Sequence, residues 1–469
     1  MRVILINPPY FIPSEAALRL GKYINVIKGG NMYFYPFEPP LGIASLTASL
    51  KKEGHETKIV DMPGDAINED GLKTILADFS PDLVGISAMT PTIKRAIEIA
   101  RLSKRIFPSV PVILGGVHPT VSPESVLSVK YVDFVVRGEG EIVLTTLLNK
   151  GLGQPEGIDG LCWKKTDGTL VITGKSLLIK DLNTIPQPDY TDFPVRRYIE
   201  YTSILRGIRG ISMMVSRGCP YQCAFCAVKE TLGDSWRSLT PEYAAEMMMG
   251  ICQKFNLKGV WFKDSIFNLL PKWTETFANH LISRNNPYQF QINSRIDLIK
   301  DKEIELLKNA GLTQIDLGIE AGTNKSLETL NKKISVDQIH ASIQLLKKKE
   351  VKVSGFFMIG IPGENEEDIL QTFHLARELN LDRASVSIFT PLPGSTIFNS
   401  LVSEGKITDN MASFEYHHFT EAKESFCEVP IDRLKEMHGE FCQYFSKHTG
   451  ILETESQENT SLITLKNIF

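Results

Sequence analysis

The sequence has no excess of positive charge, no long apolar run and no signal-peptide pattern at its N-terminus. Its 51 lysines and arginines are outnumbered by 55 aspartates and glutamates, so the formal net charge at pH 7 is −4. Proteins that bind the phosphate backbone of a nucleic acid normally carry a basic surface, so a nucleic-acid partner is not expected. The absence of a run of about 18 apolar residues gives no reason to expect a transmembrane segment.

Cysteine is also scarce: the chain has 7 cysteines among 469 residues. An odd number, with three of them grouped on one short loop, does not suit the disulfide framework of a secreted protein. A hydrophobic content of 42% and a charged content of 23% are ordinary for a globular protein, and the length is sufficient for two or three domains. We therefore expect a cytoplasmic protein of more than one domain.

The grouped cysteines are Cys219, Cys223 and Cys226, at the spacing C-x3-C-x2-C directly after the apolar run Ile211–Val215. Cysteine thiolates are the usual ligands of a 4Fe–4S cluster, and three thiolates leave one iron with an open coordination position. A structural zinc site would need a second pair of ligands nearby, whereas the next cysteine, Cys252, stands alone in a predicted helix. The spacing therefore predicts a 4Fe–4S cluster with one open iron.

Residues 1–150 alternate between short apolar strands and helices. We expect strands at Arg2–Ile6, Thr57–Val60, Leu83–Ser87, Val112–Leu114 and Phe134–Val136, and helices at Leu41–Lys52, Gly71–Phe79, Ile93–Ile106 and Glu141–Leu148. Strands that are apolar throughout predict a parallel sheet covered by helices on both faces. The fold class is therefore α/β, beginning with a flavodoxin-like, doubly wound domain whose ligand site lies at the carboxyl ends of the strands.

The remaining chain divides into three expected parts. Residues 151–205 form a connector with a hairpin at Asp167-Gly168 and otherwise extended chain. Residues 206–410 contain six strand–helix units, which predict a (β/α)6 partial barrel with its site at the carboxyl ends of the strands. Residues 411–469 form a helical extension, with a helix at Ile431–Thr449, and then a loose tail.

The cysteine loop resembles the signature of the radical S-adenosylmethionine (SAM) superfamily, C-x3-C-x-aromatic-C, with Phe225 as the aromatic residue. The resemblance implies that SAM chelates the open iron of the cluster and is cleaved to a 5′-deoxyadenosyl radical. It also implies SAM contacts on the cysteine loop and at the ends of barrel strands, at Phe225, Asp264, Arg295, Glu320, Gly360 and Pro391. Structural ion pairs remain the alternative for Asp264, Arg295 and Glu320.

Residues 1–150 are similar to the cobalamin-binding domain that precedes many radical SAM enzymes. The similarity rests on NPP at 7–9, PLGIASL at 40–46, DLVGIS at 82–87, GGVHPT at 115–120 and RGEGE at 137–141. The implied cobalamin contacts are Asn7, Pro8, Ser87, Thr90, Gly115, Gly116, His118, Gly138 and Glu139. The first loop lacks the histidine of the D-x-H-x-x-G motif, so we expect it to supply no cobalt ligand and the dimethylbenzimidazole tail to be displaced. His118 is expected to line the pocket without bonding cobalt.

These resemblances imply an enzyme with a 4Fe–4S cluster, SAM and cobalamin that methylates an unactivated carbon of a small molecule through methylcobalamin. A radical cyclase or rearrangement enzyme of the same architecture, like the anaerobic cyclase of chlorophyll synthesis, is the alternative. A non-catalytic cobalamin or redox sensor and an RNA methylthiotransferase are less favoured, because a full set of SAM motifs is present and no basic RNA-binding tail is visible. Low oxygen and an electron donor such as flavodoxin or ferredoxin are expected.

The remaining patterns are expected to be structural or to lie near the substrate. The runs Lys332-Lys333 and Lys347–Lys349 suit solvated helix faces. His438 and Cys442, at i and i+4, suit helix packing better than a second metal site, and Tyr416, His417 and Phe419 suit a position near the substrate. The substrate, the oligomeric state and the roles of Cys427 and Cys442 do not follow from the sequence.

Overall fold

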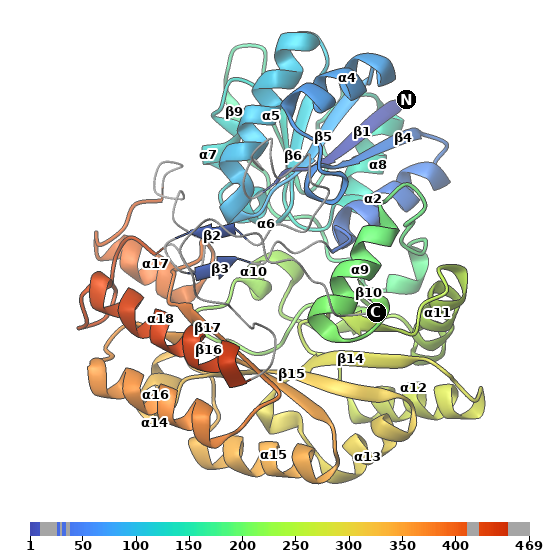
Figure 1. The fold of residues 1–469 in the computed structure, drawn as a ribbon. Coiled ribbons are helices and arrows are strands. Elements are labelled where there is room, and N and C mark those ends of the chain that lie inside the picture. Colours follow the sequence, from blue (N-terminus) through green and yellow to red (C-terminus); the bar gives the residue numbers. More distant parts are fainter. Residues whose placement is uncertain (10–25, 29–30, 34–37, 410–421, 449–469) are drawn as a thin grey trace.

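The computed structural model describes residues 1–9, 26–28, 31–33, 38–409 and 422–448. Two layered α/β units lie one above the other, joined by helix α9 (Val195–Arg206) (Figure 1). A short antiparallel pair, β2 (Val26–Lys28) and β3 (Asn31–Tyr33), lies beside them. Tyr416, His417 and Phe419, which were expected near the substrate, lie outside the described residues.

The first unit contains the predicted parallel sheet. Its five parallel strands are β1 (Arg2–Asn7), β4 (Glu56–Asp61), β5 (Leu83–Ser87), β6 (Val112–Gly115) and β7 (Phe134–Val136). They lie in the order β4-β1-β5-β6-β7, which confirms the flavodoxin-like topology.

Helices cover both faces of this sheet. Helices α2 (Leu41–Lys52) and α8 (Gly140–Lys150) pack together, and α4 (Glu69–Phe79) packs with α5 (Ile93–Ile106). Successive residues of β1 point to opposite faces, so Val3 and Leu5 belong to one hydrophobic core while Ile4 and Ile6 belong to the other. The short helices α3 (Met62–Asp65), α6 (Val117–Val121) and α7 (Pro123–Leu127) had no periodic signal in the sequence.

The chain between the two units is more structured than the expected linker. The predicted hairpin is β8 (Leu161–Lys164) and β9 (Leu170–Val171), and β8 pairs antiparallel with β7, so the first sheet has seven strands. The expectation of extended chain after this hairpin was wrong at α9. This helix begins after Pro194, ends at Gly207 in the left-handed conformation, and buries Tyr198, whose hydroxyl donates a hydrogen bond to Asp61 of β4.

The second unit is the predicted six-stranded partial barrel. Its parallel strands are β10 (Gly210–Met213), β13 (Gly259–Phe262), β14 (Gln289–Ser294), β15 (Leu312–Glu320), β16 (Lys352–Ile359) and β17 (Arg383–Ile388), in this order. The helices between the strands are α10 (Val228–Leu232), α11 (Pro241–Lys254), α12 (Pro271–Ser283), α13 (Asp301–Asn309), α14 (Asn324–Thr329), α15 (Val336–Lys348) and α16 (Glu366–Glu378), and α17 (Thr396–Ser403) follows β17. The sheet is open between β10 and β17.

Helix α18 (Ile431–His448) packs on β17 (Figure 1). His438 on this helix is buried, and its Nε2 lies 3.1 Å from the carbonyl oxygen of Val386. The Sγ of Cys442 lies 3.8 Å from the same nitrogen. This contact with the strand backbone is the packing role that the sequence favoured for His438. Within the described ranges, no helix is both long and apolar enough to span a membrane.

An aromatic cluster attaches α12 to the outer face of the barrel. Phe277 is fully buried, and its ring lies 5.2 Å from that of Phe267, 5.7 Å from that of Phe290 and 5.4 Å from that of Trp273, between centroids. The contacts with Phe267 and Phe290 are edge-to-face and the contact with Trp273 is stacked, and aromatic pairs of both kinds add to the free energy of apolar burial. The cluster therefore fixes the outward face of β13 and β14, and leaves the alternate residues of those strands on the inward face.

We predict that Phe277→Ala destabilises the protein by about 3–5 kcal/mol, because it leaves a cavity between α12 and the sheet. Urea unfolding followed by tryptophan fluorescence measures the effect. Ile282→Ala on the same helix, where the side chain is 39% exposed, is the control and should change stability little. Equal losses for the two variants would contradict this account of the cluster.

Candidate functional site

The carboxyl edge of the first sheet faces the cysteine-loop side of the barrel, and a cavity of about 300 Å³ lies between them. Its wall combines the strand-end loops and α2 of the first unit with Met214, Arg217, Thr231 and Leu232, which flank the cysteine loop in sequence. Residues about 200 positions apart thus form one site. The carboxyl edge is where a doubly wound sheet binds its ligand.

Five of the nine expected cobalamin contacts line this cavity: Ser87, Gly115, Gly116, Gly138 and Glu139. The other four, Asn7, Pro8, Thr90 and His118, are not part of its wall. The Nδ2 of Asn7 donates a hydrogen bond of 2.7 Å to Asp61. His118, expected to line the pocket, is fully buried behind the wall with its Nδ1 3.2 Å from the hydroxyl of Thr90.

Two glycines show why this wall needs small residues. Gly116 has φ +100°, and a Cβ there would lie 2.8 Å from the carbonyl oxygen of Ala88, so other residues would clash. A Cβ on Gly42 would meet no atom within 4 Å and would project into open space at the cavity. Gly42 belongs to the PLGIASL motif, yet the sequence did not identify it as a site residue. A broad ligand can approach the backbone closely at this position.

The three cysteines lie on the loop between β11 (Ser216–Arg217) and α10. The short pair of β11 with β12 (Arg237–Ser238) closes the base of this loop. Gly218, with φ +86°, makes the turn before Cys219, where a Cβ would lie 2.1 Å from the carbonyl oxygen of Ser235. The amide of Ala224 donates a 2.8 Å hydrogen bond to the carbonyl oxygen of Leu330, which attaches the loop to the barrel.

All three thiols are half-buried and free of disulfides. In the part of the chain that the structure describes, no three histidine, cysteine or acidic side chains converge closely enough to hold a single metal ion. The three loop thiols therefore do not form such a group either. A single zinc would need such convergence, whereas a cluster binds each thiolate at a separate iron. Burial raises the pKa of Cys226 to about 11, so the positive charge of bound iron is needed to hold its thiolate.

Asp264, expected to contact SAM, is fully buried under the cysteine loop. Its Oδ1 accepts hydrogen bonds from the amides of Val215 (3.0 Å) and Ser216 (2.5 Å) and from the Ser216 hydroxyl (2.5 Å). Burial raises its pKa to about 6. These contacts attach the chain just before the cysteines to the end of β13.

Arg295, expected to contact SAM, lies against the cysteine loop. Its Nη1 lies 3.5 Å from the Sγ of Cys223, and its guanidinium stacks 3.6 Å from the ring centre of Tyr221. Nε bonds Asp297 and Nη2 bonds the carbonyl oxygen of Lys332, so Arg295 is held by partners on three sides. Its positive charge adjoins a cysteine thiol.

Glu320 has φ +71°, a left-handed conformation that is rare for a residue with a side chain. A register shift between β15 and β16 occurs at the same place. Its buried carboxylate forms a 2.6 Å ion pair with Lys332. The expectation that Lys332 is solvated was therefore wrong: it is 6% exposed and its Nζ lies 5.7 Å from the ring centre of Phe225. Strained backbone of this kind is concentrated at functional sites.

Gly360 and Pro391 follow the ends of β16 and β17, as expected. Gly360 has φ +80°, and its amide and that of Ile361 each donate a 2.9 Å hydrogen bond to Glu364. Glu364 is buried, and burial raises its pKa to about 7. This acidic residue therefore stabilises its own loop. Pro391 is also buried.

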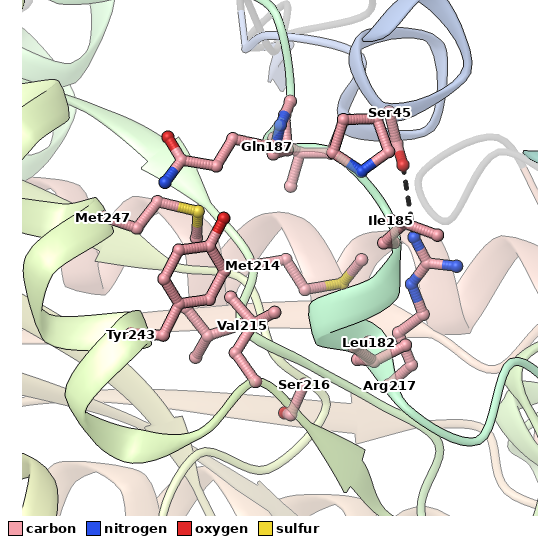
Figure 2. Close-up of a pocket in the computed structure, with 14 residues that line it drawn as sticks. Ser45, Leu182, Ile185, Gln187, Met214, Val215, Ser216, Arg217, Tyr243 and Met247 are labelled. Carbon is pink, nitrogen blue, oxygen red and sulfur yellow. Dashed lines mark hydrogen bonds between the residues drawn. The ribbon is translucent and has the colours of Figure 1, made fainter. Parts of the chain in front are cut away.

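A buried charge cluster joins the two sides of the cavity. Arg217, two residues before Cys219, bonds Glu141 through Nη2 (2.6 Å) and Glu139 through Nη1 (3.1 Å). Arg237 of β12 bonds Glu139 at 2.9 Å. Ser45 of α2 donates a 2.6 Å hydrogen bond to Glu141, and Figure 2 shows its hydroxyl beside the Arg217 guanidinium. We refer to Glu139, Glu141, Arg217 and Arg237 as the interdomain charge cluster.

The electrostatics of this cluster favour the charged forms. Burial alone would raise the pKa of Glu141, but the charge of Arg217 outweighs burial and leaves that pKa below its usual value. The two arginines had given no signal in the sequence, because a lone arginine beside a cysteine motif has no periodicity or spacing that marks a partner. The RGEGE motif contains both glutamates, but only Glu139 was expected to be a site residue, as a cobalamin contact.

Comparison with known families and structures agrees with this geometry. Residues 31–148 match the B12-binding domain, and residues 213–376 match the radical SAM superfamily. The chain is 31% identical over 369 residues to an uncharacterized methyltransferase of Pyrococcus horikoshii, covering 78% of this chain and 79% of that protein. It is 28% identical over 428 residues to the anaerobic magnesium-protoporphyrin IX monomethyl ester cyclase of Rubrivivax gelatinosus, covering 89% of this chain and 72% of the cyclase.

A solved structure has the same fold. The radical SAM methyltransferase TsrM of Kitasatospora setae, with cobalamin and a [4Fe–4S] cluster bound, superposes with a TM-score of 0.68 at 17% sequence identity. The match covers 88% of this chain and 84% of that one. At this level of identity the likeness concerns the fold alone.

We predict that Arg217→Met destabilises the protein by about 3–5 kcal/mol at pH 8, because Glu141 is left buried without a compensating charge and Glu139 keeps only Arg237. In the native chain, folding lowers the pKa of Glu141. The carboxylate therefore stabilises the folded state above the unfolded pKa, and this stabilisation is lost as the pH falls. Without Arg217 its folded pKa rises above the unfolded value, so the variant loses stability as pH rises.

Urea unfolding at pH 5 and pH 8 tests this sign: the deficit of Arg217→Met should be smaller at pH 5. Arg196→Met is the control, because that side chain is 93% exposed. A deficit that is the same at both pH values would contradict the assigned role of the buried carboxylates.

Proposed function

The chain belongs to the cobalamin-binding radical SAM family, and we propose that it methylates an unactivated carbon of a small-molecule substrate. The observation that carries this proposal is the shared cavity wall. Gly115, Gly116 and Gly138 of the B12-binding domain lie across about 300 Å³ of space from Arg217 and Thr231, which flank the cysteine loop. A cobalamin bound to the first unit would then face the cluster and the open end of the barrel.

The residues of the site suit the cofactors of this family. Cys219, Cys223 and Cys226 would hold the 4Fe–4S cluster, and Ser87, Gly115, Gly116, Gly138 and Glu139 would contact cobalamin. When bound, the cluster supplies an electron to SAM, and cobalamin supplies a carrier for the methyl group. The protein contributes orientation and the exclusion of water.

Several side chains would orient SAM and the cluster. Glu320 is held in a strained conformation and paired with Lys332. We propose that its carboxylate binds the amino group or the ribose hydroxyls of SAM. Phe225 on the cysteine loop, and Gly360 and Pro391 after the ends of β16 and β17, are also proposed SAM contacts. Arg295 and Asp264 are better suited to positioning the cysteine loop, since one bonds Cys223 and the other bonds the backbone at residues 215–216.

Methyl transfer is favoured over cyclisation by the sequence similarity to a methyltransferase. The similarity to a cyclase in sequence keeps a radical cyclisation as the second candidate. We also propose a small electron-donor protein such as flavodoxin or ferredoxin, no nucleic-acid partner, and a reducing, cytoplasmic setting, because a cluster with an open iron is sensitive to oxygen.

We predict that changing any one of the three loop cysteines to alanine lowers the iron content and abolishes the broad visible absorption of the cluster. Each thiolate is expected to bind one iron, and the loop carries no spare cysteine to replace it. Cys442→Ala is the matched control, because this half-buried thiol lies on α18 away from the loop. Iron analysis and visible spectra after anaerobic reconstitution measure the outcome. Full iron retention in a loop variant would contradict the ligand assignment.

The proposed reaction is tested with the full chain, reconstituted anaerobically with iron, sulfide and hydroxocobalamin. Near-stoichiometric cobalt and about four irons per chain are expected. With a reductant and SAM, formation of both 5′-deoxyadenosine and S-adenosylhomocysteine indicates methyl transfer. 5′-Deoxyadenosine alone would favour the cyclase alternative, and iron without cobalt would contradict the cobalamin assignment.

A further inference from the structure

The inward face of the barrel sheet carries a polar layer below the SAM-binding end. The strand register pairs Asn293 with Asp316, Asp316 with Ser354, and Ser354 with Arg383. These residues alternate with Ile315, Leu317 and Val386, which are buried in the hydrophobic core under the outer helices. The polar layer therefore faces the interior of the barrel.

Two of the three cations near this layer are already neutralised. Arg206, at the end of α9, forms a 2.5 Å ion pair with Asp316 and stacks 3.3 Å from the ring centre of Trp261. Lys263 forms a 3.1 Å ion pair with Glu38 and lies 3.7 Å from the centre of a Trp261 ring. The indole thus lies between two cations, each with its own carboxylate.

Arg383 is the exception. Among the described residues it forms no hydrogen bond and no ion pair, although it is half-buried at the start of the edge strand β17. Burial, together with the nearby charge of Arg206, lowers the pKa of its guanidinium more than the carboxylates of Asp316 and Asp382 raise it, so the charge is less favoured here than in water. Among the described residues, Arg383 is the one of these three cations that forms no ion pair with a carboxylate, although Asp316 and Asp382 lie near enough to favour its charge. A single bound anion would pair with it, and the planar guanidinium suits a carboxylate.

Apolar surface lies directly above this guanidinium. Phe356 is 39% exposed, although it is a large apolar residue on the inward face of a central strand. It pairs with Ser385, which is also exposed and lies two residues after Arg383 on β17. The next inward residue of β16 is the half-buried Met358. A ligand whose apolar part packs on Phe356 and Met358 would therefore place an anionic group at Arg383.

We propose that the substrate is an amphipathic carboxylic acid, whose carboxylate binds Arg383 and whose apolar body covers Phe356. This inference rests on the proposed function and adds a substrate class to it. Four residues of strand separate Arg383 from Ser387, which pairs with Met358 near the SAM end. At about 3.3 Å per residue, the reacting carbon lies on the order of 10 Å from the carboxylate. The reaction therefore occurs far from the acid group of the substrate.

Isothermal titration calorimetry of the reconstituted full chain tests this subsite. The probes are decanoate and 3-phenylpropionate, each compared with its uncharged primary amide. We expect at least one acid to bind about tenfold more tightly than its amide, the size of a charged hydrogen bond. Arg383→Gln should remove that preference and leave amide binding unchanged, whereas Arg383→Lys should restore part of it.

The matched control is Arg284→Gln, the same change on an arginine that is 59% exposed near the end of α12. Iron and cobalt contents of each variant verify that the site is assembled. The inference is overturned if neither acid binds, if acid and amide bind equally, or if Arg383→Gln binds the acid as well as the native chain does.

The subsite and the proposed function can fail separately. Cleavage of SAM by the native chain is measured in parallel, without any probe. Selective binding of an acid to a chain that cleaves no SAM would contradict the proposed function and support the anion subsite. SAM cleavage by a chain that shows no preference for acids would contradict the subsite alone.

Discussion

The arrangement of the whole site depends on the buried ion pairs of Arg217 with Glu139 and Glu141. The glutamates belong to the loop after β7 and the start of α8, and the arginine lies two residues before Cys219. Charged groups buried this deeply are tolerated only when each meets an opposite charge with good geometry. The two α/β units are therefore fixed relative to each other at the point where the cavity wall and the cysteine loop meet.

A second layer of constraints positions the cysteine loop on the barrel. Asp264 binds the backbone before the loop, Arg295 contacts Cys223, and Leu330 accepts a hydrogen bond from Ala224. The ion pair of Glu320 with Lys332 lies at the same end of the sheet and holds a residue with positive φ. Asp264, Arg295 and Glu320 each lie at the carboxyl end of a strand or directly after it, and Leu330 and Lys332 follow helix α14. The barrel interior has a different character, with a cation–indole stack and with Arg383, which forms no ion pair within the described part of the chain.

Much of this could be predicted from local sequence signals. The Leu41–Lys52, Leu83–Ser87 and Ile93–Ile106 elements have the predicted bounds, because apolar periodicity and the flanking turn residues agree there. Helix α9 was missed because its stability comes from burying Tyr198 against β4, a tertiary contact without a local pattern. Lys332 was misassigned for a similar reason: adjacent lysines usually face solvent, and only the fold places Glu320 beside this one. Glu139 was identified as a site residue, but its partners Arg217 and Arg237 lie about 80 and 100 positions further along the chain.

The central claim is that one cavity wall places cobalamin beside the 4Fe–4S cluster, and the magnetic interaction between the two tests it most directly. Electron paramagnetic resonance of the full chain, loaded with both cofactors, compares the cob(II)alamin signal with the cluster oxidised and reduced. The account predicts that the reduced, paramagnetic cluster broadens this signal and speeds its relaxation. An unchanged cob(II)alamin signal, in protein with full cobalt and a reduced cluster, would contradict the shared site.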